Sequence, residues 1–218
     1  MNYYIVVEGQ AEKHVYKSWI PLINPHLSYV DNFSDVSYNN FYIVSGNGYP
    51  YFFKIISNGI EDVNNSKLFQ KLIIAVDAEE MSYEEKYREI DNYIQKFSCS
   101  CPISIIIQYY CLETWGLGNR SVPKRNTTDT TLQTYFNFFN VIQEDPELMP
   151  SIDSEKFTRS QFAYSYLKKI INDRNSKLSY SKSNPKVLTQ NHYFTQIRQR
   201  VIDCGHIPHF QELIDVFL

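Results

Sequence analysis

The chain has 218 residues, of which 43% are hydrophobic and 21% charged, and its formal net charge is −3. These values are typical of a folded globular protein and exclude a disordered chain. No apolar run approaches the roughly 18 residues of a membrane span, and the N-terminal MNYYIVVEG lacks the basic segment of a signal peptide. The four cysteines show no zinc-ligand spacing and are expected to be reduced. Together these features predict a cytoplasmic protein with no membrane partner.

Segments typical of strands and helices alternate through the first half of the chain. Apolar β-branched runs predict the strands, and apolar residues three and four positions apart predict the helices between them. In chain order the expected elements are strand Tyr3–Val7, helix Lys13–Ile23, strand Phe41–Val44, helix Tyr49–Ile60, strand Leu72–Val76, helix Tyr83–Phe97 and strand Ile103–Ile107. This alternation predicts an α/β fold, a mostly parallel four-stranded sheet with flanking helices on both faces.

The pattern changes after residue 120. Residues 121–131 are polar and contain Pro123, which predicts a loop. Beyond it, apolar spacing predicts only helices, at Thr134–Gln143, Ser160–Asn172, Tyr193–Val201 and Phe210–Phe217. We therefore expect an α/β domain of residues 1–120 and a mainly helical, basic region of residues 121–218.

Charge is unevenly distributed along the chain. Residues 1–149 contain 11 Lys and Arg against 18 Asp and Glu, whereas residues 150–218 contain 10 against 6. Between Lys156 and Arg200 ten basic residues accompany a single acid, Asp173. This favours a phosphate-binding surface, although solvated helix faces would give the same pattern. The predicted nucleic-acid-binding residues are Lys168, Lys169, Arg174, Lys177, Lys182, Lys186, Arg198 and Arg200.

Carboxylates follow three of the four predicted strands. Glu8 comes after the first strand, Asp77 and Glu79 after the third, and Glu113 after the fourth. In open parallel sheets, ligands bind outside the carboxyl ends of the strands. Carboxylates gathered there repel one another unless a cation lies between them, and Mg²⁺ or Mn²⁺ prefers oxygen ligands. The sequence therefore predicts a divalent-metal site, and a pair of such ions is suited to cleaving a phosphodiester.

Four short motifs point to a family. EGQAE (Glu8–Glu12) resembles the EG-x-x-E motif of Toprim domains, the fold shared by topoisomerases, bacterial primases and OLD-family nucleases. Asp77–Glu79 stands where such domains carry D-x-D, and Ser45–Gly48 where OLD-like members have a glycine-containing turn. Leu112–Trp115 is similar to the E-x-W of small stand-alone Toprim proteins. The resemblance covers roughly residues 1–120.

The resemblance implies cleavage of DNA or RNA with Mg²⁺ or Mn²⁺. It implies that Glu8 is a metal ligand or general acid/base, that Asp77 and Glu79 are catalytic metal ligands, and that Glu113 is an additional ligand. Glu12 is either a further ligand or an acid favoured by the helix dipole. The second acid of the D-x-D position is a glutamate, one methylene longer than aspartate. Glu79 can thus exchange roles with Glu80, and whether one or two metals bind stays open.

OLD-type nucleases also use a lysine beyond the Toprim core to neutralise transition-state charge, a role for which Lys182 and Lys186 are the candidates here. Such nucleases work with an ATPase, and this chain contains no G-x-x-x-x-G-K-[ST] pattern. The leading hypothesis is an endonuclease effector of antiphage defence that acts with a separate ATPase or regulatory protein. The alternative is a non-catalytic Toprim-fold module that binds nucleic acid or a protein. A weaker third reading is a receiver-like domain with Asp77 as phosphoryl acceptor, and whether the protein forms a homodimer stays open.

Overall fold

The computed structural model describes residues 1–46, 48 and 50–218. The strands are β1 (Tyr3–Val7), β2 (Ser28–Tyr29), β3 (Asn40–Ser45), β4 (Lys71–Asp77) and β5 (Ile103–Gln108). The helices are α1 (Gln10–Ile23), α2 (Tyr51–Ser66), α3 (Tyr83–Ile94), α4 (Leu112–Gly116), α5 (Thr130–Phe138), α6 (Arg159–Arg174), α7 (Asn191–Cys204) and α8 (Pro208–Phe217). Short 3₁₀ turns cover Phe33–Asp35 and Pro146–Leu148.

The described residues divide into two compact units. Unit 1 contains residues 1–76, 82–107 and 213–218, and unit 2 contains residues 77–81 and 108–212. The last residue of β4, Asp77, thus begins the first segment of unit 2. The boundary expected after residue 120 stays a prediction.

Unit 1 is organised by an all-parallel sheet in the order β2-β3-β1-β4-β5. The central strand β1 is buried along its whole length and pairs with β3 and β4, so that Val7 is level with both Ser45 and Ala75. A strand covered on both faces is expected to be apolar throughout, as YYIVV is. The α/β fold with a parallel sheet is therefore confirmed, and it has one more strand than expected, the two-residue edge strand β2.

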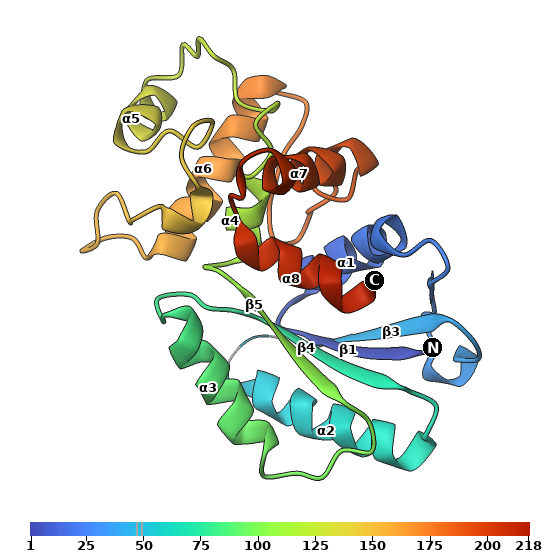
Figure 1. Ribbon diagram of the computed structural model, residues 1–218. Coiled ribbons are helices and arrows are strands. Elements are labelled where there is room, and N and C mark those ends of the chain that lie inside the picture. The colour runs from blue at the N-terminus through green and yellow to red at the C-terminus, as the bar shows by residue number, and fades with distance from the viewer. Residues whose placement is uncertain (47, 49) are drawn as a thin grey trace. The chain divides into compact units, whose positions relative to one another are not determined.

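Helices cover both faces of this sheet, with α1 on one face and α2 and α3 on the other (Figure 1). The C-terminal turn of α8 also belongs to unit 1, where the ring of Phe217 lies 5.2 Å from that of Tyr3. The start of α3 is set by a capping box, in which Ser82 accepts a hydrogen bond from the backbone N–H of Glu85 and Glu85 reaches back to that of Ser82.

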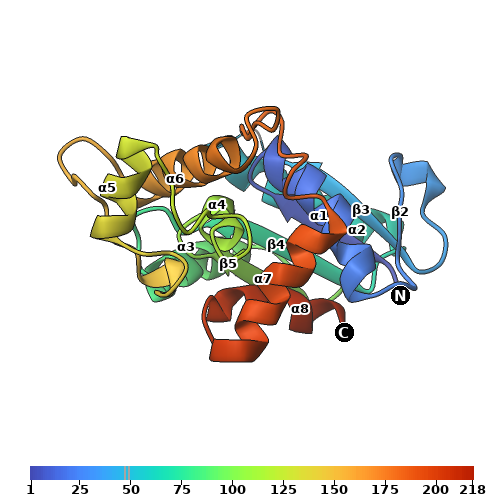
Figure 2. The same cartoon turned by 90° about the horizontal axis from the view of Figure 1, so that it is seen from above.

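Unit 2 contains α4 to α7 and the first turn of α8. Helix α6 packs on α4 and α5, and Figure 2 shows α5 alongside α6. Thr158 and Gln161 form a capping box at the start of α6. The buried face of α6 carries Phe162 and Tyr166, whose rings both contact that of Tyr135 from α5.

Several predicted elements differ from the observed ones at their ends. Helix α1 begins at Gln10, three residues early, α2 continues to Ser66, and α3 ends at Ile94. The expected start of α2 at Tyr49 lies outside the described residues. Helix α5 begins four residues before its expected start at Thr134, because Asp129 caps it by accepting from the backbone N–H of Leu132. The five-residue helix α4 was not predicted, since it is too short to show apolar periodicity.

None of the helices in the described part of the chain has the length and apolar character that crossing a bilayer requires.

The packing of α2 on β1 in unit 1 predicts the effect of enlarging Gly59. A Cβ atom at this position would lie 3.0 Å from a ring carbon of Tyr4 and 3.2 Å from a methyl of Val6. We expect Gly59→Val to lower the free energy of unfolding by about 1–3 kcal/mol through overpacking. Urea unfolding measures this, with Glu61→Val on the exposed face of α2 as the control for helix propensity. Equal losses of unfolding free energy in both variants would show that the close approach of Gly59 to Tyr4 and Val6 does not limit the size of residue 59.

Candidate functional site

The two acids of the first motif lie at the junction of β1 and α1 in unit 1. Glu8 directly follows β1, Gly9 caps α1, and Glu12 is buried in the first turn of the helix. A Cβ atom on residue 9 would lie 2.7 Å from the Glu12 carboxylate oxygen Oε2. Glycine therefore leaves the room that the Glu12 carboxylate occupies, and the helix N-terminus stabilises negative charge there. The E-G-x-x-E spacing has a structural reason within this unit.

The glycine turn after β3 is tied to the same junction. Gly46 N–H donates to the carbonyl of Val7 at 2.8 Å, and Gly48 N–H donates to that of Glu8 at 3.1 Å. Gly48 has φ +82°, which side-chain-bearing residues rarely adopt. Asn47, the third residue of this motif, lies outside the described residues. The turn thus holds the backbone of Glu8 in place.

In unit 2, the segment that begins with Asp77 runs beside the end of β5. Ala78 N–H donates to Gln108 O at 3.0 Å and Glu79 N–H donates to Tyr110 O at 2.8 Å. Asp77 is buried, whereas Glu79 is exposed and has φ +55°, a left-handed conformation unusual for a residue with a side chain. Only Glu79 of these two acids is therefore accessible to solvent in this unit.

Glu80 has a structural partner. Its Oε1 accepts from Arg159 N–H at 2.6 Å, at the start of α6, and its carbonyl accepts from Arg159 Nη2 at 2.8 Å. The Arg159 guanidinium also lies 3.8 Å from the ring centre of Tyr110. A carboxylate at a helix N-terminus that is also paired with an arginine is well compensated. Glu80 thus has a structural partner in Arg159, and an exchange of roles between Glu79 and Glu80 stays a prediction.

Glu113 lies on α4 and is only 1% exposed. Its Oε1 accepts from the Tyr180 hydroxyl at 2.8 Å, and its Oε2 is buried with no hydrogen-bond partner among the residues that the structure describes. Burial, followed by the charges of Glu113 and Asp77, raises the pKa of the Cys111 thiol well above its ordinary value. Both carboxylates therefore act on the same buried thiol, which stays protonated at neutral pH.

The fit to a divalent cation can be judged within unit 2. Across residues 1–46, 48 and 50–218, no three His, Cys, Asp or Glu side chains are gathered into a group that would enclose a metal ion. Mg²⁺ is, however, often held through one or two carboxylates and keeps several waters. Asp77 and Glu113 are two such carboxylates, and the unbonded Oε2 of Glu113 is a donor atom in need of a partner. These residues fit a hydrated hard cation.

The basic residues predicted to bind nucleic acid have different surroundings. Lys168 and Lys182 are exposed and line hollows beside α6, and Lys169 pairs with Asp129 at 3.1 Å. Arg174 lines another hollow of unit 2, with His192 and Tyr193 among its neighbours. The other exposed residues predicted to bind nucleic acid are Lys177, Lys186 and Arg198.

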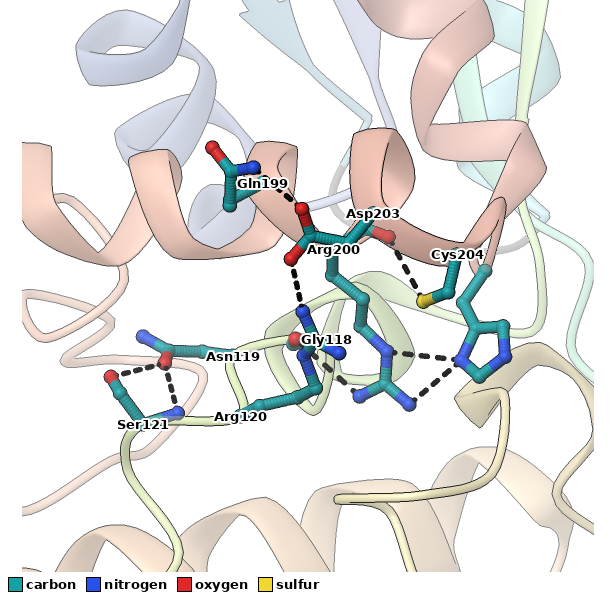
Figure 3. A network of polar contacts seen from close by, with 9 residues as sticks. Gly118, Asn119, Arg120, Ser121, Gln199, Arg200, Asp203 and Cys204 are labelled. Atoms are coloured by element: carbon teal, nitrogen blue, oxygen red, sulfur yellow. Dashed lines mark hydrogen bonds and ion pairs between the residues drawn. The ribbon is translucent and has the colours of Figure 1, made fainter.

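Arg200 is the exception, because its side chain is fully buried. Its guanidinium donates to the carbonyls of Val141 (2.6 Å) and Glu144 and lies 3.0 Å from Nδ1 of His206. Figure 3 shows it reaching back toward Gly118. Burial lowers the pKa of Arg200 to about 10, so it remains charged at neutral pH. The prediction that Arg200 lies on a nucleic-acid surface is therefore corrected to a structural role.

A second buried group was not predicted at all. Glu147 accepts from the indole N–H of Trp115 at 2.9 Å and lies 2.7 Å from Nδ1 of His209. Trp115 itself is fully buried and belongs to the core of the unit. The sequence contains no signal for this pairing, since Glu147 and His209 are 62 positions apart.

Comparison with family models, with curated proteins and with solved structures finds no match for this chain.

The buried position of Arg200 predicts a large effect on stability. Replacing it by methionine leaves the carbonyls of Val141 and Glu144 without their donor in the interior. We expect Arg200→Met to lower the free energy of unfolding by about 3 kcal/mol or more. The matched control is Arg198→Met, an exposed position on the same helix, for which about 0.5 kcal/mol or less is expected. Urea unfolding of both variants tests this, and a similar small effect at both positions would contradict it.

The Glu147–His209 pair predicts a pH dependence of stability. Burial lowers the pKa of His209, but the hydrogen bond and charge of Glu147, helped by Glu212 and Asp145, outweigh this and raise it above 6.5. Its contribution to stability is therefore complete below the unfolded value of about 6.5 and is lost as the pH rises through the higher folded value. We expect the free energy of unfolding to fall above pH 6.5, by at most about 1.4 kcal/mol per pH unit for one proton.

Urea unfolding between pH 6 and 8 measures this dependence, with Glu147→Gln as the test variant. The fall should be smaller in Glu147→Gln, because the partner that raises the pKa of His209 is gone. Glu155→Gln, at an exposed position of the same unit, should keep the full dependence. An unchanged pH dependence of stability in Glu147→Gln would contradict its assignment to the Glu147–His209 pair.

Proposed function

We propose that this protein is a divalent-metal-dependent nuclease of the Toprim type that cleaves phosphodiester bonds in DNA or RNA. The observation that carries the proposal is the burial of two carboxylates in unit 2, Asp77 and Glu113, whose charges both act on the Cys111 thiol. Buried carboxylates need a compensating charge or hydrogen bonds, and Oε2 of Glu113 has no partner within the described residues. Such oxygen donors are the ligands that Mg²⁺ and Mn²⁺ prefer.

The strand order supports the same proposal. The chain passes from β1 to β3 on one side and then to β4 on the other side of β1. Open parallel sheets bind their ligands outside the carboxyl ends of the strands, at the point where the order reverses. Glu8 directly follows β1 and Asp77 is the last residue of β4, so the two strands at the reversal are those that end in predicted ligands.

Each acidic residue has a stated task in this proposal. A bound Mg²⁺ or Mn²⁺ supplies Lewis-acid polarisation of the phosphate and activation of water. Asp77 and Glu113, both in unit 2, would hold it. Ligation by Glu8 and Glu12 of unit 1 stays a prediction from the sequence. Glu79 is exposed and acidic, which suits it to accept a proton from the attacking water or to complete the ligand set.

The residues that line the hollows favour one of the two candidates for the catalytic lysine. Lys182 lines the same hollow as Glu79, and a lysine close to the acids is suited to neutralise charge on the phosphate. Lys186 is exposed on the following turn and stays the second candidate.

The wider biological role rests on the family resemblance alone. We propose an effector of antiphage defence in the cytoplasm, controlled by a separate ATPase or regulatory protein. The chain has no phosphate-binding loop pattern of its own.

The proposal predicts that cleavage depends on Asp77. Plasmid, single-stranded DNA and total tRNA are incubated with wild type and with Asp77→Asn, in Mg²⁺ or Mn²⁺ and in chelator. We expect cleavage by wild type, none in chelator, and a loss of about 100-fold or more in Asp77→Asn, because a metal ligand matters at least as much as the groups that orient it. Glu84→Gln, an exposed acid on α3, is the control and should cleave as wild type does.

Calorimetric titration with Mn²⁺ separates the two hypotheses. Binding by wild type that is weakened in Asp77→Asn and Glu113→Gln supports the metal site. If wild type neither cleaves nor binds Mn²⁺, the acids are not a metal site and the non-catalytic binding module is the better account.

A further inference from the structure

One face of α6 lines two adjoining hollows that lie wholly within unit 2. The first has a volume of about 720 Å³ and the second about 440 Å³, and both are lined by Tyr164 and Ser165. We call the two together the α6 trough. Its lining residues on α6 recur at helical spacing: Ser160, Gln161, Tyr164, Ser165, Lys168, Lys169 and Asn172.

The trough follows the helix for a substantial distance. From Gln161 to Asn172 an α-helix rises roughly 16 Å, at about 1.5 Å per residue. Stacked nucleotides of one strand rise about 3.4 Å each, so this length has room for roughly three to five nucleotides. Two open hollows in series suit a linear polymer better than a single small molecule.

Aromatic rings and lysines both line the trough. The first hollow contains Lys156 and Lys182 beside Phe157, whose exposure of 41% is high for a phenylalanine. Tyr164 lies where the two hollows meet. The second hollow adds Lys168 and the half-buried Tyr135. Lys169 and Tyr180 also line it, but Lys169 is paired with Asp129 and Tyr180 is only 1% exposed. Rings for stacking and cations for phosphates are the two components of a site for unpaired nucleic acid.

The helix N-terminus is not what attracts a ligand here. Arg159 N–H already donates to the carboxylate of Glu80, and Gln161 N–H donates to the hydroxyl of Thr158. These two N–H groups at the start of α6 are therefore already hydrogen-bonded within the protein and do not form an anion site.

Ser160 also lines the first hollow, and its buried Oγ finds no hydrogen-bond partner among the described residues. A polar ligand would satisfy this hydroxyl.

We propose that the α6 trough binds single-stranded nucleic acid, with a base stacked on Tyr164 and phosphates on Lys168 and Lys182. This inference rests on the proposed nuclease function, because it specifies the form of the substrate. Glu79 lines the Lys182 end of the trough, so the strand would enter the acidic end of unit 2 there.

The composition of the trough favours a single strand over a duplex. In a duplex the faces of the bases are stacked on one another, so Tyr164 and Phe157 would have nothing to stack on. A duplex would also bring its second phosphate backbone toward the negative charges of Glu79 and Glu80 in the same hollow. A single strand can place its bases on the rings and its phosphates on the lysines.

Binding can be measured without cleavage, by fluorescence anisotropy in chelator with labelled dT12, rU12 and a 12-base-pair duplex. We expect wild type to bind at least one single strand more tightly than the duplex, and the dT12 and rU12 arms distinguish DNA from RNA. Tyr164→Ala should weaken binding about tenfold, whereas Tyr164→Phe, which keeps the ring, should bind as wild type does. Tyr38→Ala, at a tyrosine that is 78% exposed in unit 1, is the control.

The salt dependence tests the lysines separately. Lys168→Gln and Lys182→Gln should each reduce the slope of log affinity against log salt by about 0.7, the value for one phosphate contact to a single strand. Lys54→Gln, at an exposed lysine of α2 in unit 1, should leave the slope unchanged.

The proposal is overturned if wild type binds no single strand, if it prefers the duplex, or if Tyr164→Phe loses as much affinity as Tyr164→Ala. These outcomes differ from failure of the nuclease proposal. Binding without any metal-dependent cleavage by wild type would leave the trough supported and the nuclease proposal refuted.

Discussion

An ionised carboxylate can stay in a protein interior only when hydrogen bonds or an opposite charge compensate it. This constraint accounts for much of the polar structure in both units. In unit 1, the buried Glu12 lies at the N-terminus of α1, and Gly9 is small enough to leave it room. In unit 2, Glu147 is held by the indole of Trp115 and by His209. Burial raises the pKa of Glu147, and these two partners limit the rise.

For Glu113 this compensation is incomplete within the described residues. Tyr180 satisfies one of its oxygens, while the other is buried without a hydrogen bond. Glu147 shows that the same unit can compensate a buried carboxylate fully, because both of its oxygens are bonded. The difference between two glutamates in one unit is therefore the physical argument for a cation at Glu113, whereas Glu147 serves stability.

Helix α6 has a buried face and an open face. Its buried face packs Phe162, Tyr166 and Ile170 into the interior of unit 2. Its open face carries Tyr164 and Lys168 along the trough. A helix fixed by its apolar side presents the other side as a rigid row, which limits the entropy lost on binding an extended strand. That one helix can be a core element and, in our proposal, a binding element follows from its 3.6-residue period.

The sequence by itself determined the strands and helices of unit 1 and its parallel sheet, because apolar runs and helical spacing are local signals. It also pointed to Glu8, Asp77 and Glu113 as acids that follow strands, since the position of an acid after an apolar run can be read along the chain. It could not assign α4 or the two-residue β2, which are too short to show a period.

Only the tertiary structure decided which charged residues are buried and what they contact. Arg198 and Arg200 are two positions apart and look alike in sequence, yet one is exposed and the other donates to carbonyls in the interior of unit 2. Glu147 and His209, and likewise Glu113 and Tyr180, are separated by more than 60 residues and meet only after folding. Burial and long-range pairing depend on how elements pack, and packing is a property of the folded chain that no local pattern of residues contains.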